Sequence, residues 1–268
     1  MHGILPQIAA RYLTKARLPV KERSDGRGRF RERRGNMAAE RVIAFSTEIW
    51  VAEGPVVRFM GFPYPTRMAI IRLNDGGLFL WSPIALTPGL QATVDALGPV
   101  RYLVAPNKLH HLFLGDWKTA YPWARMYAPP GLTRRRRDLA FDEKLTNEPP
   151  AVWSAEIDQT FVHGSFALTE AAFFHRASKT VLITDLIQCF PPDWFKGWRR
   201  WVAKRTGIVG PKPGTPIDFR TSFTNRRVLR QSIERILGWQ PEHLIVAHGP
   251  LIEEDAVGYI RQALSWAA

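Results

Sequence analysis

Residues 103–111 have the sequence LVAPNKLHH, in which a short apolar run is followed at once by polar and ionisable side chains. Two later stretches repeat this arrangement, LITD at residues 182–185 and LIVAHG at residues 244–249. Each apolar run has the length of a buried strand, and the polar residues stand where that strand ends. In a sheet flanked by helices, the loops at the carboxyl ends of strands meet and form sites. These three stretches therefore predict a site at the edge of the sheets of an α/β protein.

The rest of the chain supplies the strands and helices that such a fold needs. Asn74-Asp75-Gly76-Gly77 is typical of a hairpin turn between two strands, and Thr87-Pro88 is typical of a helix start. Strands are predicted at 56–59, 68–73, 78–81, 102–105, 125–127, 171–174, 181–184 and 243–247, and helices at 88–97, 112–120, 221–237 and 253–266; residues 131–150 are predicted to be a loop. Strands and helices follow one another without a break in composition, which predicts one α/β domain over residues 41–268.

The net charge of +13 is concentrated near the amino terminus. Residues 1–36 hold ten Lys and Arg against three acids, which is +7, and leave +6 for the rest of the chain. We therefore expect residues 1–40 to be a basic, disordered head. Three interpretations of the head stay open: an arm that binds nucleic acid, an organelle transit peptide, or a translated leader before a start at Met37. No specific nucleic acid partner is expected.

Composition excludes several classes of protein and places the chain by default in the cytoplasm. A hydrophobic fraction of 46% without repeats excludes disordered, collagen-like and coiled-coil chains. Cys189 is the only cysteine, so an intramolecular disulfide and a thiolate zinc site are excluded and a reducing compartment is expected. No apolar stretch approaches the roughly 20 residues of a membrane span. An organellar location is expected instead if the head is a transit peptide. The sequence does not indicate the oligomeric state.

The polar residues that follow the three apolar runs have the chemistry of metal ligands. His110, His111 and His248 offer imidazole nitrogens, and Asp185 offers a carboxylate. Three imidazoles with one carboxylate suit zinc or iron. The alternative for each residue is a buried or capping polar side chain without a metal.

With these motifs and this order of elements, the chain resembles the metallo-β-lactamase-like hydrolase superfamily over about residues 46–262. More closely, it resembles a domain family of unknown function within that superfamily, whose members carry a P-N-x-x-H-H stretch and a late A-H-G. The resemblance implies an α/β fold of the metallo-β-lactamase type, a four-layer αβ/βα sandwich. It also implies metal binding between the two sheets, where most members hold two ions.

The resemblance further implies that one of the two metal positions has been lost. The superfamily motif H-x-H-x-D-H falls on residues 106–111, and two ligands of the first metal become Pro106 and Lys108, while the third becomes Glu170. The four ligand positions of the second metal keep liganding types in His110, His111, Asp185 and His248. We therefore expect one divalent metal, zinc or iron, held by these four residues. Lys108 and Glu170 are expected to pair across the vacated position and to assist proton transfer or bind the substrate.

These expectations favour a metal-dependent hydrolase with a reduced, mononuclear site, acting on an ester, thioester or phosphoester of a small anionic molecule. One alternative is a catalytically inactive or non-hydrolytic binding scaffold of the same fold, so the sequence leaves open whether the protein is an enzyme. A second alternative is a nucleic-acid-binding protein that uses the basic head.

The tryptophan-rich segment over residues 190–216 contributes to that second alternative because it is also basic. We favour packing on the domain or a lid over the site as its role. Contact with an anionic membrane surface is the alternative role for this segment.

Overall fold

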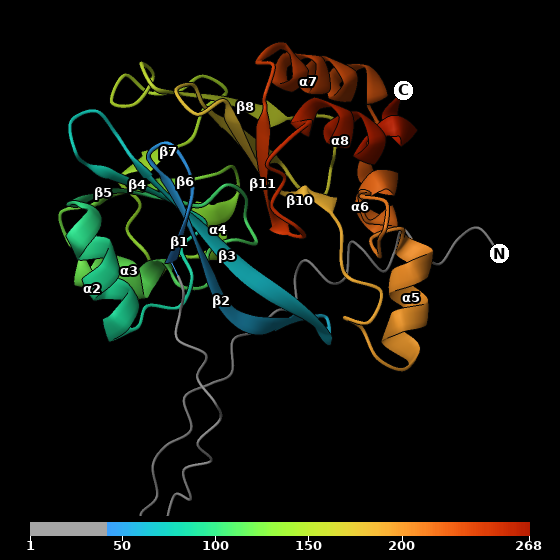
Figure 1. Ribbon diagram of the computed structural model, residues 1–268, viewed down its shortest axis with the longest axis horizontal. Helices are drawn as coiled ribbons and strands as arrows, with labels where there is room; N and C mark the ends of the chain where they lie inside the picture. The colour runs from blue at the N-terminus through green and yellow to red at the C-terminus, as the bar shows by residue number, and fades with distance from the viewer. Residues whose placement is uncertain (1–41) are drawn as a thin grey trace, which may run out of the picture. The chain divides into compact units, whose positions relative to one another are not determined.

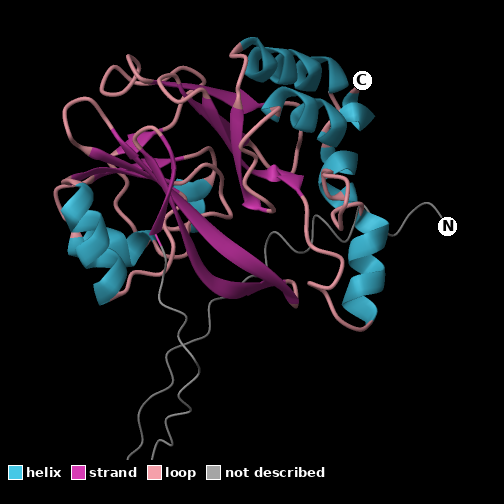
Figure 2. Ribbon diagram, viewed as in Figure 1, coloured by secondary structure: helices cyan, strands magenta, loops and turns pink. Residues whose placement is uncertain are grey.

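The computed structural model describes residues 42–268, so the predicted basic head, residues 1–40, lies outside the described part. Two β-sheets lie face to face in this part, and helices cover their outer faces (Figure 1, Figure 2). The first sheet has seven strands in the order of the chain: β1 (Val42–Ser46), β2 (Ile49–Phe59), β3 (Phe62–Arg72), β4 (Leu78–Trp81), β5 (Val100–Val104), β6 (Arg125–Ala128) and β7 (Glu143–Lys144).

The second sheet has four strands in the reverse of the chain order. It runs β11 (His243–His248), β10 (Thr180–Gln188), β9 (Glu170–His175) and β8 (Ile157–Val162). The helices are α2 (Pro88–Leu97), α3 (Leu114–Ala120), α4 (Leu132–Arg135), α5 (Trp198–Thr206), α6 (Ile217–Ser222), α7 (Arg226–Gly238) and α8 (Ala256–Ala263), with a final 3-10 turn at Ser265–Ala267. None of the helices within residues 42–268 is long and apolar enough to cross a membrane.

Three apolar cores separate four layers of structure. The central core lies between the sheets and joins side chains such as Phe79 and Val104 from the first sheet to Phe173 and Ile245 from the second. A second core packs the outer face of the first sheet against α2 and α3, and a third packs the outer face of the second sheet against α7 and α8. The predicted four-layer αβ/βα sandwich is thereby confirmed, because the central strands of both sheets bury one face between the sheets and the other under helices.

The turn predicted at Asn74–Gly77 joins two antiparallel strands, β3 and β4. Gly76 has φ +80°, a conformation that glycine adopts without steric cost, and the Asp75 carboxylate accepts a hydrogen bond from the Gly77 amide. The predicted helix over residues 88–97 is also confirmed, and the Thr87 hydroxyl caps it by accepting from the Leu90 amide.

The basic, tryptophan-rich segment contains a helix that its Pro and Gly content concealed. Helix α5 follows Gly197 and ends at Gly207, whose φ of +76° closes the helix in the left-handed conformation. The segment packs a small apolar cluster of Phe190, Phe195, Ala203 and Ile208 against the β2–β3 hairpin, in which Phe62 and Tyr64 take part. Packing on the domain, one of the two favoured roles of this segment, is therefore what the structure shows for its buried side.

Candidate metal centre

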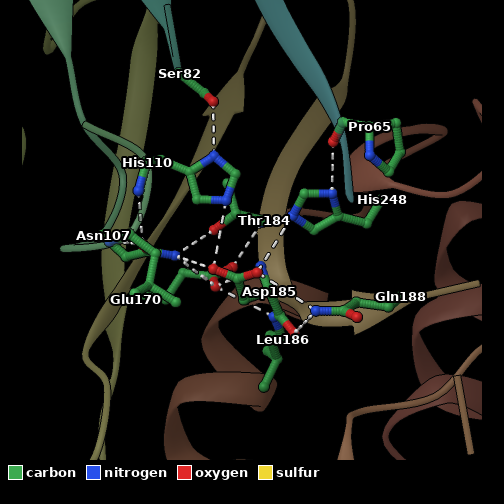
Figure 3. Close-up of polar contacts among 11 residues, drawn as sticks. Pro65, Ser82, Asn107, His110, Glu170, Thr184, Asp185, Leu186, Gln188 and His248 are labelled. Carbon is green, nitrogen blue, oxygen red and sulfur yellow. Dashed lines mark hydrogen bonds and ion pairs between the residues drawn. The ribbon is translucent and has the colours of Figure 1, made fainter. Parts of the chain in front are cut away.

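Asp185 lies at an irregularity in β10 rather than at the end of the strand. The ladder between β10 and β11 runs in register to Ile183, breaks, and resumes at Gln188. Such a break bends the strand and re-aims the side chains within it. Asp185, inside the break, is buried and points toward two imidazoles, those of His110 and His248 (Figure 3).

His110, Asp185 and His248 form a group that could hold a metal ion, with one ligand atom from each lying within 4.8 Å of the others. Nε2 of His110 lies 3.3 Å from Oδ2 of Asp185, and Nε2 of His248 lies 3.4 Å from Oδ1. His110 belongs to the loop after β5, and His248 ends β11. The structure thus brings together three of the four predicted ligands, from three separate parts of the chain.

The carbonyl oxygen of Pro65 determines that the proton of the His248 imidazole stands on Nδ1. Its Nδ1 donates to the carbonyl of Pro65 at 3.0 Å, and a carbonyl oxygen only accepts. Burial lowers the pKa of His248, which favours the neutral imidazole despite the neighbouring Asp185. In that tautomer the lone pair of Nε2 faces the Asp185 carboxylate. Tyr64 and Phe190 pack against the His248 ring and fix its plane.

His110 has a more adaptable support than His248. Its Nδ1 lies 2.7 Å from the hydroxyl of Ser82, which can donate or accept. Ser82 directly follows β4 and has φ +54°, so the end of this neighbouring strand orients the imidazole. When the hydroxyl accepts from Nδ1, the lone pair of Nε2 also faces Asp185. Such an outer partner is the usual way in which a metal-binding histidine is oriented.

The nitrogen and oxygen atoms of His110, Asp185 and His248 are better arranged to bind a metal ion than to hydrogen-bond to one another. Burial raises the pKa of Asp185, whereas His110 and His248 in their protonated, hydrogen-bond-donating forms lower it well below its usual range. With neutral imidazoles whose protons stand on Nδ1, a cation would have to supply the charge that keeps this carboxylate ionised. A neutral Nε2 and a carboxylate oxygen are both acceptors, and acceptors repel each other unless a cation lies between them. Two ligands of one tetrahedral zinc ion lie about 3.3 Å apart, which is the spacing that follows from zinc bond lengths near 2 Å.

Glu170 holds the backbone at the break in β10. Its carboxylate accepts from the amides of Thr184 and Asp185, both at 2.7 Å, and of Leu186 at 3.1 Å. These amides stand where the ladder with β11 is interrupted. Burial and the Asp185 charge raise the pKa of Glu170 to about 7, while the amide hydrogen bonds oppose that rise. Glu170 is fully buried, so its carboxylate is not open to solvent. Through its hydrogen bonds to the backbone amides, it fixes the position of Asp185.

Asn107 ties the histidine loop to the carboxylates. Its Nδ2 donates to Asp185 Oδ2 at 2.7 Å and to the Thr184 hydroxyl at 2.9 Å, and its Oδ1 accepts from the amides of Leu109 and His110. It is completely buried, so each of these bonds is made in a low-dielectric setting. This residue was not singled out from the sequence as functional, although it is the Asn of the P-N-x-x-H-H stretch.

Arg67 was also missed, because its partners are remote in the chain. It extends from β3 of the first sheet, and its Nη1 donates to the carbonyls of Val246 and Gly249, which flank His248. Its other side pairs with Glu53 on β2. Arg67 is only 8% exposed. One guanidinium therefore joins the two sheets at the strand end that carries His248.

His111, the fourth predicted ligand, lies outside the group of three. Its Nδ1 is 3.0 Å from Nη1 of Arg136, and a guanidinium only donates, so the lone pair of Nδ1 is already used. The remaining ring proton of the neutral imidazole then stands on Nε2. Burial, with Arg135 and Arg136, lowers the pKa of His111 to about 4. His111 therefore offers no free lone pair in this arrangement.

The expected pair between Lys108 and Glu170 does not form in the described structure. The partners of Glu170 are the amides of residues 184–186, the Thr184 side chain and Asn107. Lys108 is half-buried and has no hydrogen-bond or ion-pair acceptor within residues 42–268. Burial and the charge of Arg135 lower the pKa of Lys108. Arg135 also has no acceptor there. Two partly buried cations without counterions thus lie near the histidine loop.

Comparison with known families gives one match. A family model described as "Domain of unknown function (DUF4336)" matches residues 47–196, more than half of the chain. The match contains His110, His111 and Asp185, and it ends before α5 and β11. No curated protein matches the chain.

Comparison with solved structures finds metallo-β-lactamases. The DIM-1 metallo-β-lactamase exposed to ceftazidime is 13% identical, with a TM-score of 0.59 over 85% of this chain and 98% of that one. The metallo-β-lactamase from Pontibacter korlensis is 12% identical, with a TM-score of 0.57 over 85% and 98%. The FIM-1 enzyme from Pseudomonas aeruginosa in its mono-zinc form is 11% identical, with a TM-score of 0.59 over 85% and 96%. The fold is therefore an α/β sandwich of metallo-β-lactamase type, and identities this low establish the fold alone.

Proposed function

We propose that this chain, which belongs to the family described as the domain of unknown function DUF4336, is a metal-dependent hydrolase with one divalent metal held by His110, Asp185 and His248. The observation that carries the proposal is the Nε2 of His248, which faces the Asp185 carboxylate at 3.4 Å while its Nδ1 donates to Pro65. Two acceptors held this way need a cation between them.

The number of ligands favours a reactive site over a closed one. Three protein ligands are the usual set of catalytic zinc sites, whereas four close a structural site. His111 was the expected fourth ligand, and its bond with Arg136 removes it from the set that we propose. A metal in this position supplies Lewis-acid activation of water and of a carbonyl or phosphoryl oxygen. One of the solved structures of similar fold, FIM-1, is itself a mono-zinc form.

The residues around the group have separate roles in this proposal. Glu170 and Asn107 hold Asp185 and the histidine loop, and Arg67 holds the end of β11. Lys108 and Arg135 supply positive charge beside the loop without acceptors of their own. Such cations favour a substrate that carries a carboxylate or phosphate group. We therefore propose a small anionic ester, thioester or phosphoester as the substrate.

Metal content tests the proposal without a known substrate. We expect the purified protein, supplied with zinc or iron, to retain about one metal ion per chain by mass spectrometry, the number that one group of three ligands holds. His248→Ala and His110→Ala should lose the metal while keeping the native circular dichroism spectrum. His111→Ala is the matched control, because it removes the adjacent imidazole and should keep the metal.

Three results would overturn the proposal. A content of two ions per chain would restore the two-metal site of the superfamily. No bound metal after supplementation with both ions would support the inactive scaffold. Loss of metal in His111→Ala to the same extent as in His248→Ala would replace the set of three by the set of four.

A further inference from the structure

We propose that the tip of the β2–β3 hairpin and helix α5 together form a surface that docks on an anionic lipid bilayer. We call it the hairpin–α5 surface, and it contains Phe59, Met60, Trp198 and Trp201 with the cations Arg199, Arg200, Lys204 and Arg205. It is separate from the three proposed metal ligands, and the inference stands whether or not the chain is a hydrolase.

The apolar part of the surface is exposed to solvent on two neighbouring elements. Trp198 and Trp201 are each 60% exposed, and Met60 at the hairpin tip is 50% exposed. They lie on two elements that are far apart in the sequence but adjacent in space (Figure 1). Large apolar side chains gathered on one face of a folded domain mark an interaction site. Indole rings in particular favour the interface between lipid headgroups and acyl chains.

Direct contacts hold the two elements together. Nε of Arg199 donates to the carbonyl of Gly61 at 2.8 Å, and the Phe62 ring meets the Trp198 ring edge-on with centroids 5.4 Å apart. Behind them, the indole of Trp194 donates to the Pro63 carbonyl at 3.0 Å. The exposed apolar groups are therefore presented by a preformed platform, which lowers the conformational cost of binding.

The charge of α5 and its flanks is positive and uncompensated. Residues 194–217 contain six Lys and Arg and no acid. Within residues 42–268, none of these six cations forms an ion pair. Two arginines instead lie over the exposed indoles, Arg199 over Trp198 at 4.8 Å and Arg205 over Trp201 at 4.3 Å. A partner that supplies many negative groups around an apolar phase complements this pattern.

A bilayer fits the hairpin–α5 surface better than two other partners do. A second copy of the chain would bring two faces of the same positive charge together, which costs free energy. The phosphates of a nucleic acid would pair with the cations. They would leave Phe59 and Met60 on the hairpin tip without an apolar environment in which to be buried. Basic helices with Trp on the exposed face lie in the plane of anionic interfaces, where apolar burial and charge attraction act together.

Binding of the full chain to lipid vesicles tests the inference. We expect cosedimentation with vesicles of phosphatidylcholine and phosphatidylglycerol, and much weaker binding to vesicles of phosphatidylcholine alone. Trp201→Ala should weaken binding about tenfold, the effect of one large apolar side chain. The double variant Arg200→Glu/Lys204→Glu should weaken it at least about twentyfold, because each surface cation contributes about fivefold.

Matched controls separate this surface from general charge and hydrophobicity. Trp123 is 67% exposed elsewhere on the domain, so Trp123→Ala removes an equally exposed indole. Arg134→Glu/Arg137→Glu reverses two exposed cations outside α5. Both control variants should bind anionic vesicles with an affinity within about twofold of that of the parent chain, since neither changes the proposed lipid contacts. Equal loss in controls and test variants, or no loss in either test variant, would overturn the inference.

A second measurement places the hairpin tip directly. The only native cysteine, Cys189, is buried, so Met60→Cys can be labelled selectively with an environment-sensitive dye. Anionic vesicles should shift its emission toward shorter wavelength, and the same dye on Trp123→Cys should not respond. The inference fails if Met60→Cys gives no shift with vesicles, if it shifts with DNA in place of vesicles, or if Trp201→Ala dissolves a dimer instead of releasing vesicles.

Discussion

Arg67 supports the end of β11 around His248 from the opposite sheet. It is buried, and it donates to carbonyl oxygens on both sides of that histidine. A carbonyl that loses a buried charged donor keeps its desolvation cost without a partner. Arg67 thus contributes to stability and to the position of a proposed ligand at the same time.

We predict that Arg67→Met lowers the free energy of unfolding by about 2–4 kcal/mol, because it leaves buried acceptors unpaired. It should also weaken metal affinity about 10- to 100-fold, the usual effect of removing an outer partner of a ligand. Urea unfolding and a metal titration measure the two effects. Arg72→Met is the control, because it makes the same change on the same strand in a half-exposed ion pair. Equal effects of the two variants would contradict the role assigned to Arg67.

The pair of Glu48 and Arg72 gives a prediction about pH. The Arg72 hydrogen bond lowers the pKa of Glu48 below its ordinary value of 4.5. A lowered pKa in the folded state means that stability is present above pH 4.5 and is lost as the pH falls through the folded pKa. Because both side chains are more than a third exposed and screened by solvent, we expect Glu48→Gln to cost only about 0.5 kcal/mol at pH 7.

The difference between Glu48→Gln and the parent chain should be smaller at pH 3 than at pH 7, because the Glu48 carboxyl loses its charge as the pH falls through its lowered pKa, while the Gln amide is uncharged at both. Urea unfolding at the two pH values measures it. Glu254→Gln, which removes an exposed acid outside any ion pair of the described residues, should show no such difference at either pH. A difference that grows in acid would mean that the pair destabilises the fold.

At the scale of elements, the sequence predicts what local patterns encode. The strand at residues 78–81 and the helix at 88–97 have the bounds that the turn and cap residues indicate. Strands β1, β7 and β8 were missed, and β7 lies within the predicted loop at 131–150. In β8, apolar and polar residues alternate less clearly because nearly all of its residues are buried. Helix α4 lies within the predicted loop at 131–150 and begins at a glycine with no side-chain cap.

The candidate site was predictable only in part, for the same reason. His110, Asp185 and His248 follow apolar runs, and this local signal is visible in the sequence. The supports of these residues are not: Pro65 lies 183 residues from His248, and Ser82 lies 28 residues from His110. The role of His111 depends on a guanidinium that a folded loop places beside it. Such long-range contacts leave no periodicity from which they could be predicted.

Close packing explains why residue 249, the last of the A-H-G stretch, is a glycine. A Cβ there would lie 3.2 Å from the backbone nitrogen and oxygen of Cys189 and 3.0 Å from Val246. The close approach allows the Cys189 amide to donate to the His248 carbonyl at 2.9 Å. The glycine therefore lets the end of β10 approach the end of β11, which brings the strands of Asp185 and His248 together.

At the scale of the whole molecule, the matched family region is shorter than the folded unit. Residues 47–196 contain the first sheet apart from β1, and they lack β11 and the helices α7 and α8 that cover the second sheet. A chain truncated after Lys196 would expose the apolar core between the second sheet and these helices. We predict that it aggregates or lacks a cooperative unfolding transition by circular dichroism.

Removal of residues 1–36 is the control for this truncation, since the first strand begins at Val42. The shortened chain should unfold cooperatively with a free energy close to that of the full chain. A cooperative transition in the chain truncated after Lys196 would show that the matched region folds by itself.

The position of β11 in the second sheet also sets an order of events during protein synthesis. The strand lies beside β10 but leaves the ribosome last of all the strands, more than fifty residues after β10. His110 and Asp185 are therefore translated before His248, the third member of the proposed ligand set. In the proposed site, the full set of three ligands is complete only after β11 has joined β10, so metal uptake would report that the second sheet has been assembled.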